Sequence, residues 1–240
     1  MDISEKNFSV EKFTPKQILI PLLAMDGLLG ILYLIFIDHP EWSSFFNLAG
    51  ENNLPTWYSS FQFFLVALAA FYCLAGEKQF SANSIYPWAW GVVAILMLAL
   101  SIDETMQIHE TLIDAVMSGA AGEKLRTYFG ATRETDSLLW TVVFAPPMIL
   151  VGVGMMGFYL SAFKNVPKLF WGSLAALSLL ALAAGFEYLE ARVLIDANEG
   201  AMNQYHLLTL IEEMAEFLAA TLLVWVHYSY AWGLIRKNVS

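Results

Sequence analysis

Cysteine and positive charge are what this sequence has least of. Cys73 is the only cysteine and lies in an apolar run, which excludes a disulfide framework, a CxxC motif and a thiolate metal site. Lys and Arg total 12 against 22 Asp and Glu, giving a formal net charge of -10. Proteins that track phosphates carry clustered Lys and Arg, so we expect no nucleic-acid partner. Walker and GxSxG motifs are also missing, so P-loop nucleotide binding and serine hydrolysis have no support.

Charge of either sign is scarce as well. Only 14% of the residues are charged, whereas 58% are hydrophobic and 15% aromatic. Soluble proteins carry roughly 25% charged residues, so a protein embedded in a lipid bilayer explains this composition better than a soluble protein does. Six apolar stretches are long enough to cross ~30 Å of hydrocarbon. We therefore predict an all-α, integral membrane six-helix bundle forming a single transmembrane domain over residues 1–240, with helices at about 17–37, 55–75, 86–106, 138–163, 169–191 and 208–232.

Aromatic residues and prolines mark the predicted helix ends. Pro146 and Pro147 are exceptions inside 138–163 and predict a kink there. Tryptophan and tyrosine are typical of the two membrane interfaces. The residues that fit such an interfacial belt are Trp57, Tyr86, Trp88, Trp140, Trp171 and Trp232.

The distribution of Lys and Arg predicts the orientation, because positively charged connections are retained in the cytoplasm. Eight of them fall on the side of both termini and four on the other side, so we expect both termini to be cytoplasmic, in a bacterial inner membrane. The eight are Lys6, Lys12, Lys16, Lys78, Lys164, Lys168, Arg236 and Lys237, and the four are Lys124, Arg126, Arg133 and Arg192.

The connection after the third predicted helix is long, from about residue 107 to 137. Its first part, within SIDETMQIHETLIDAVM, keeps helical spacing and contains no helix breaker. We therefore predict that the third helix continues past residue 106. In such a helix Asp103, Gln107 and Glu110 would share one stripe.

Acidic and histidine side chains gather at the outer ends of three predicted helices. Ionisable groups in a membrane span are costly unless they are paired, so each is a functional hypothesis. Glu216 lies about one turn deeper than its neighbours. The third helix carries Asp103, Glu104, His109 and Glu110, the fifth carries Glu187 and Glu190, and the sixth carries His206, Glu212, Glu213 and Glu216.

So many carboxylates close together require protons or cations, because like charges raise one another's pKa. Arg192 is the only fixed positive group nearby in the sequence. Glu, Asp and His side chains suit iron, manganese or zinc, so a divalent metal could supply the missing charge. Bound protons would do so equally well and would indicate a proton relay.

Our leading hypothesis is a membrane-embedded, metal-dependent hydrolase or oxidoreductase with an outward-facing site that acts on a lipid-like or small substrate. The metal would activate water or oxygen, and a spare carboxylate would act as general base. The predicted metal ligands are His109, Glu187, His206 and Glu213, and the predicted catalytic carboxylates are Glu216 and Glu104.

Two versions of the metal site can be distinguished. A di-iron bundle uses Glu-x-x-His motifs, but this chain has only ExxE, at Glu187/Glu190 and Glu213/Glu216. A zinc site could instead use the three outer histidines, a set loosely similar to membrane hydrolases of the alkaline ceramidase and adiponectin receptor type. Those histidines are His39, His109 and His206.

Two non-enzymatic functions remain open. In a cation or proton transporter, Asp26 would extend the acidic path inward, although the inner half holds few ionisable residues and His227 is expected at an interface. In an accessory subunit of a larger membrane complex, the small-residue motifs GLLG and GVGMMG would allow close approach of partner helices.

Three motifs carry a family resemblance. LPTWYSS opens the second predicted helix, SIDETMQIHE ends the third and IEEMAEF lies in the sixth. Together these PTW, DE...HE and EExxE patterns resemble a widespread group of uncharacterised bacterial multi-pass membrane proteins. The resemblance groups the three motifs and implies no established activity.

Overall fold

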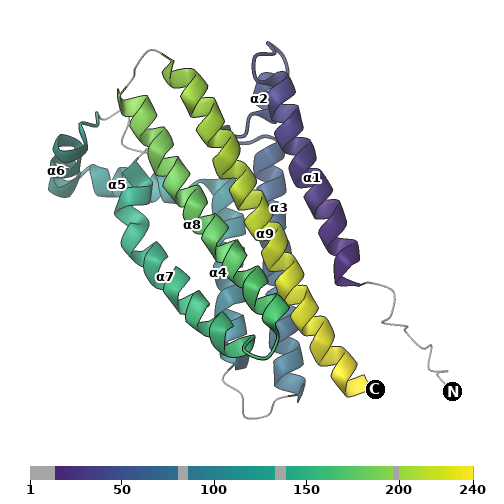
Figure 1. Ribbon diagram of the computed structural model, residues 1–240. Helices are drawn as coiled ribbons and strands as arrows, with labels where there is room; N and C mark the ends of the chain where they lie inside the picture. The colour runs from purple at the N-terminus through teal and green to yellow at the C-terminus, as the bar shows by residue number, and fades with distance from the viewer. Residues whose placement is uncertain (1–13, 81–85, 133–138, 197–199, 240) are drawn as a thin grey trace, which may run out of the picture.

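The structure is a computed structural model that describes residues 14–80, 86–132, 139–196 and 200–239, and the regular elements in these ranges are all α-helices (Figure 1). Their bounds are α1 Pro15–Phe36, α2 Ser43–Phe46, α3 Leu54–Phe80, α4 Tyr86–Met106, α5 Ile108–Met117, α6 Ala120–Phe129, α7 Trp140–Ala162, α8 Pro167–Asp196 and α9 Ala201–Val239. Three of the helices, α2, α5 and α6, are short, and the other six run roughly along one axis.

Five of these helices are long and apolar enough to cross a membrane: α1, α3, α4, α7 and α8. Many large apolar side chains on them are exposed, as lipid contact requires; Ile149 and Leu150 on α7 are 65% and 74% exposed. The fold is therefore compatible with an integral membrane protein. α9 is not among the five, and it is the least apolar of the long helices.

α9 forms the centre of the bundle. It packs against α1, α3 and α8, and Phe217, Leu223 and Val226 on it are fully buried. Figure 1 shows α7, α8, α9 and α1 side by side, with α3 and α4 behind them. Because α9 faces protein on several sides, it can hold polar residues that a lipid-facing helix could not.

Close contacts fix the helices around α9. A Cβ atom on Gly30 of α1 would lie 2.8 Å from Sδ of Met214, so the GLLG motif does allow a close approach. Nothing lies within 4 Å of such an atom on Gly152, Gly154 or Gly157, so the glycines of the GVGMMG motif on α7 make no close helix contact in the described chain. α7 also continues as one helix through its two prolines.

The helix bounds differ most from the predicted ranges where the sequence is polar. α4 coincides with the predicted 86–106, but α3 extends beyond residue 75 to Phe80. Glu77, expected in a connection, is therefore inside the bundle and only 2% exposed. His227 is fully buried rather than interfacial. The expectation that this half of the molecule holds few ionisable groups is thus wrong for these two residues.

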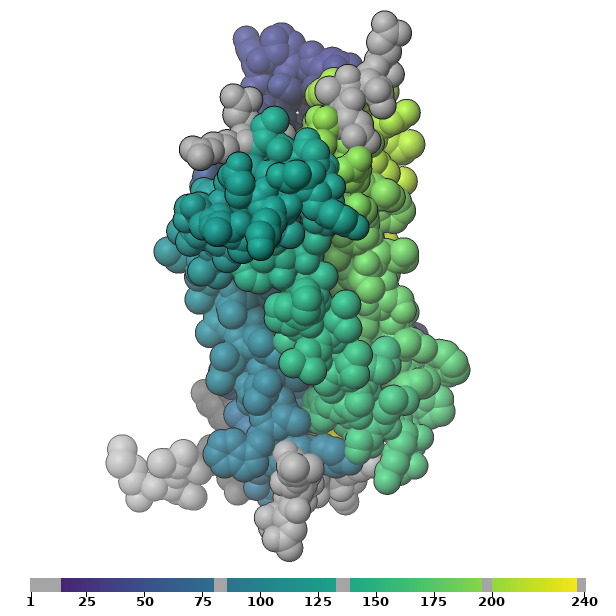
Figure 2. Space-filling view, turned by 90° about the vertical axis from the view of Figure 1, so that its left-hand side faces the viewer, coloured from purple at the N-terminus to yellow at the C-terminus, as the bar shows by residue number. Residues whose placement is uncertain are grey.

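The predicted continuation of the third helix past residue 106 is also wrong. Gln107 has φ 51° in the left-handed region, where the chain leaves the axis of α4 and begins α5. The shared stripe of Asp103, Gln107 and Glu110 is therefore not formed. α5 and α6 instead lie across one end of the bundle, where Figure 2 shows them as a teal block of side chains on the upper half of the face.

Candidate functional site

A cavity of about 200 Å³ lies at the end of the bundle where α5 and the connection between α1 and α3 meet α8 and α9. None of the described residues that line it is Lys or Arg. We call it the acidic cavity, because seven glutamates line it. They are Glu51, Glu104, Glu110, Glu187, Glu190, Glu212 and Glu213, and the other polar residues in the lining are His109, Trp140, Thr56, Tyr205 and Thr209.

The break between α4 and α5 places a histidine in the wall of this cavity. Asp103, in the last turn of α4, accepts a hydrogen bond from the backbone N–H of His109 at 2.9 Å. Its other oxygen lies 2.8 Å from Nδ1 of the same imidazole. The carboxylate thus caps α5 and fixes the ring. A histidine whose Nδ1 is held by a carboxylate presents Nε2 to a ligand, an arrangement common at metal sites.

The environment of His109 favours its charged form. Burial lowers the pKa of the imidazole, but the hydrogen bond that its ring donates to Asp103 and the negative charges of Asp103, Glu187 and Glu110 raise it more, so the net pKa lies above the ordinary value. The ring also packs on Trp140, with the centroids 4.7 Å apart. His109 is therefore the one group in the cavity wall that can offset carboxylate charge as a cation.

Trp140 is a wall of the cavity rather than part of an interfacial belt. Its indole N–H donates to Glu187 on α8 while its ring packs on His109, so it links α7 to both. Trp88 and Trp171, at 78% and 63% exposed, have the exposure that an interfacial belt requires. A single sequence shows that Trp140 begins a helix but does not show which face it turns to the bundle.

Glu190 on α8 and Glu212 on α9 lie close to each other in the cavity wall. Two neighbouring carboxyl groups can form a hydrogen bond only when one of them carries a proton. The hydroxyl of Thr209, in the same wall, donates to the backbone carbonyl of Tyr205 at 3.0 Å. Glu190 is only 7% exposed, and its Oε1 is buried without a partner in the described protein.

The predicted catalytic carboxylates lie on the deeper side of the site. Glu104 lines the cavity, and the buried Ser59 on α3 lies near it. Glu216 is not in the lining, but its charge interacts with those of Glu104, Glu187 and Glu213. These four glutamates come from three different helices, α4, α8 and α9.

His206 is the predicted ligand that the structure does not bring to the cavity. Its Nδ1 lies 3.0 Å from the hydroxyl of Tyr33 on α1. His39 is also elsewhere: its Nδ1 accepts hydrogen bonds from the backbone N–H groups of Glu41 and Trp42, each at 3.3 Å. With His109 bonded to Asp103, the three outer histidines have separate partners, so the predicted three-histidine zinc site is not formed.

Glu51 and Glu110 belong to the cavity but were not proposed as site residues. Glu51 lies in the connection before α3, where Asn53 donates to the carbonyls of Asn47 and Gly50 at 2.7 and 2.8 Å and folds the loop back. Burial and the negative charge of Glu110 raise the pKa of Glu51. The one sequence signal was that this connection, 38–56, holds no Lys or Arg.

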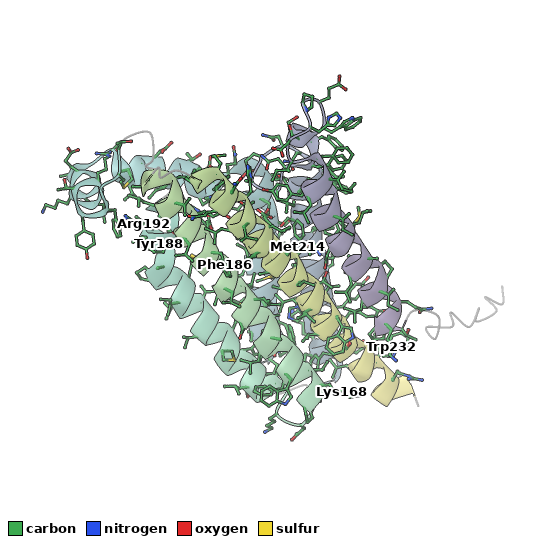
Figure 3. The ribbon with its side chains drawn as sticks, turned by 45° about the horizontal axis from the view of Figure 1, so that its top comes forward. Lys168, Phe186, Tyr188, Arg192, Met214 and Trp232 are labelled. Atoms are coloured by element: carbon green, nitrogen blue, oxygen red, sulfur yellow. The ribbon has the colours of Figure 1, made fainter. Side chains whose placement is uncertain are left out.

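Arg192, the expected positive partner, is not among the residues that line the cavity. One of its guanidinium nitrogens donates to the backbone carbonyl of Phe129 at the end of α6, at 2.9 Å. Figure 3 shows Arg192 near the end of α8, at the end of the bundle opposite Lys168 and Trp232. The arginine therefore links α8 to the end of α6.

The arrangement can hold protons or a cation. Its donors are carboxylate oxygens and one imidazole nitrogen, which suit hard or borderline divalent metals. Among the residues that the structure describes, no three His, Cys, Asp or Glu side chains are already arranged around one point as ligands of a metal ion. A proton shared by neighbouring carboxyl groups, such as Glu190 and Glu212, could supply part of the missing charge.

Fold and site together define the class: a helical protein suited to a membrane, with a glutamate-lined cavity at one end of its bundle. The chain belongs to the family described as a domain of unknown function, DUF8692, whose model matches residues 22–232. This agrees with the resemblance to an uncharacterised family that the sequence motifs suggested. Neither a curated protein nor a solved structure matches the chain.

Proposed function

We propose that this protein is a membrane-embedded, metal-dependent enzyme whose acidic cavity binds a divalent cation. The observation that carries the proposal is the lining itself: seven glutamates and one histidine surround about 200 Å³ with no Lys or Arg among the described lining residues. Confining that much negative charge is unfavourable without a cation. Iron, manganese and zinc all suit the available donors.

His109, Glu187 and Glu213 are the ligands that we propose, from α5, α8 and α9. All three line the cavity, and the Asp103–His109 pair orients the imidazole as a ligand. Their side chains would have to turn toward a common point when the metal binds. A metal bound there would lower the pKa of a coordinated water or coordinate oxygen, and Glu104 or Glu216 would then accept a proton as general base.

The orientation is part of the proposal. α1 begins and α9 ends at the same end of the bundle, opposite α5 and α6 (Figure 1). Lys16, Lys78, Lys164 and Lys168 lie in the parts of the helices and connections at that end. By the positive-inside rule this end is cytoplasmic, which places the acidic cavity at the outer face. We propose α9 as the sixth spanning helix and the bacterial inner membrane as the location.

A lipid-like or small substrate fits this position. The cavity has apolar residues in its lining, Leu48, Ala191 and Leu194, beside the carboxylates. Exposed apolar side chains on α5, such as Leu112 at 50%, lie next to the same end of the bundle. A substrate with an apolar part and a polar head could therefore approach from the membrane interface.

Metal analysis of the protein purified in detergent without chelators tests the proposal. We expect about one or more divalent ions per chain, bound as the ligand side chains turn toward the metal. Glu213→Gln and His109→Gln should lower the metal content. Glu41→Gln, which changes an exposed carboxylate outside the cavity, is the matched control and should not. Wild-type protein without stoichiometric metal, even after incubation with iron, manganese or zinc, would contradict the proposal.

The enzymatic part needs its own measurement. Metal-loaded protein is incubated with a bacterial lipid extract, and the lipids are compared by mass spectrometry with those treated with Glu216→Gln protein. We expect one lipid class to be consumed by the wild type and spared by the variant. Identical lipid profiles, with and without added oxygen, would exclude a lipid-like substrate.

A further inference from the structure

Buried polar side chains also gather near the end of the bundle opposite the acidic cavity. Glu77 on α3 accepts a hydrogen bond from Tyr230 on α9. Nε2 of His227 lies 2.7 Å from the hydroxyl of Tyr159 on α7. Trp90 on α4 joins the two pairs, since its ring lies 5.4 Å from that of Tyr230 and 5.0 Å from that of His227. We call these five residues the distal cluster.

Three polar atoms of the distal cluster have no hydrogen-bond partner in the described protein. They are Oε2 of Glu77, Nδ1 of His227 and Nε1 of Trp90, and all three are buried. Buried polar atoms are nearly always bonded, to protein or to water. An acceptor oxygen, an imidazole nitrogen and an N–H donor together can bind water and pass a proton.

A third polar group lies between the cavity and the distal cluster. Asp26 on α1 is fully buried and accepts hydrogen bonds from Tyr58 at 2.6 Å, Gln62 at 2.9 Å and Thr221 at 2.9 Å. All three donors are neutral, and Oε1 of Gln62 is buried without a partner. A carboxyl group in mid-bundle with only neutral neighbours is typical of a proton relay.

α9 contributes to each of the three polar groups. Glu216 lies beneath the acidic cavity, Thr221 bonds to Asp26, and His227 belongs to the distal cluster. At ~1.5 Å of rise per residue these positions are ~7.5 Å and ~9 Å apart along the helix. Gln62 spans the first interval. It donates to Asp26 at one side and to the backbone carbonyl of Phe217, the residue after Glu216, at the other, the latter at 3.3 Å.

The second interval is apolar. Leu223 and Val224 on α9 are buried there, against Val66 and Ala70 on α3. The backbone adds one polar contact on the distal side, where the thiol of Cys73 donates to the carbonyl of His227 at 3.1 Å. This apolar layer separates the distal cluster from Asp26 in the structure.

We propose that α3 and α9 form a proton path that connects the acidic cavity with the opposite end of the bundle through Asp26 and the distal cluster. The acidic cavity is at one end of this path, and Glu77 is at the other. Each transfer moves a proton between oxygen and nitrogen atoms, with no other bond formed and no oxidant needed. The path closes where Leu223 and Val224 exclude water. It goes beyond the metal-dependent reaction and does not depend on it.

Proton flux in liposomes tests the path. The full chain is reconstituted with a pH-sensitive dye inside, and a potassium diffusion potential drives protons inward. We expect the wild type to acidify the interior faster than protein-free liposomes do. Asp26→Asn should slow the flux to the protein-free rate, because the amide keeps the shape of the side chain but cannot exchange a proton. His227→Gln should do the same from the distal side.

Asp38→Asn is the matched control, since Asp38 is an exposed carboxylate just beyond α1, and it should retain the wild-type flux. Wild-type flux equal to that of protein-free liposomes would overturn the proposal, as would wild-type flux in both Asp26→Asn and His227→Gln. Metal content is measured on the same preparations. Asp26→Asn should keep the wild-type metal content, so failure of the proton path is distinguishable from failure of the metal site.

Discussion

Asp103 and His109 are joined by two hydrogen bonds across the break between α4 and α5. This pair has a consequence that depends on pH. Because the folded-state pKa of His109 lies above the ordinary value of 6.5, the pair stabilises the fold below that value, and the stabilisation is lost as pH rises through the folded-state pKa.

Asp103→Asn tests this at the residue scale. The amide cannot attract the imidazolium as the carboxylate does, so the variant should be less stable than the wild type at mildly acidic pH, with a difference that shrinks toward alkaline pH. Thermal unfolding of the metal-free protein across pH measures it. Asp38→Asn is the control. A difference that stays the same from mildly acidic to alkaline pH would show that the pair acts through capping alone.

Single residues of the site were predicted unevenly, for a physical reason. Helical spacing indicates which side chains share a face, and it placed Glu213 and Glu216 together on α9. It does not indicate which neighbouring helix that face meets. His206 was assigned to the metal by that spacing, yet α1 packs over it and offers Tyr33 as its partner.

At the scale of elements, glycine at one crossing controls how α8 meets α9. A Cβ atom on Gly172 would lie 2.9 Å from both the Trp225 ring and Cγ2 of Val226, and neither can move freely inside the bundle. Gly172→Ala should therefore destabilise the protein by about 1–3 kcal/mol through overpacking. Chemical denaturation in detergent measures the change.

Gly157→Ala supplies the control for that substitution. It is the same change in a helix, but nothing lies within 4 Å of the new atom, so stability should stay within about 1 kcal/mol of the wild type, in the stabilising direction. If both variants were equally stable, the close approach of α8 and α9 at Gly172 would be refuted.

The long helices could be predicted from the length of the apolar stretches, but the break at Gln107 could not. Nothing in DETMQIHE is a strong helix breaker, and residues on both sides are helical. The break is stabilised by the side chain of Asp103, which accepts a hydrogen bond from the backbone of His109 in α5. The helix propensities of single residues do not describe such a contact. The same limit applies to Glu77, whose burial depends on the partner Tyr230 from the far end of the chain.

For the whole molecule, orientation in the membrane is the property that decides what the acidic cavity can meet. The sequence predicts it only through the Lys and Arg balance, since the apolar surface of the bundle is the same whichever end faces outward. Cys73 makes a direct measurement possible, because the one natural thiol is fully buried and should not react with a charged maleimide. Single cysteines can therefore be introduced without removing it.

Glu41→Cys places a thiol on the exposed connection after α1, at the acidic end, and Lys164→Cys places one on the exposed connection after α7, at the opposite end. In intact bacterial cells, a membrane-impermeant maleimide should label the first and not the second, and both should be labelled after the membrane is opened. The wild type, with Cys73 alone, gives the background. Labelling of Lys164→Cys alone in intact cells would place the acidic cavity at the cytoplasmic face. The metal would then have to come from the cytoplasm, and any lipid substrate from the inner leaflet.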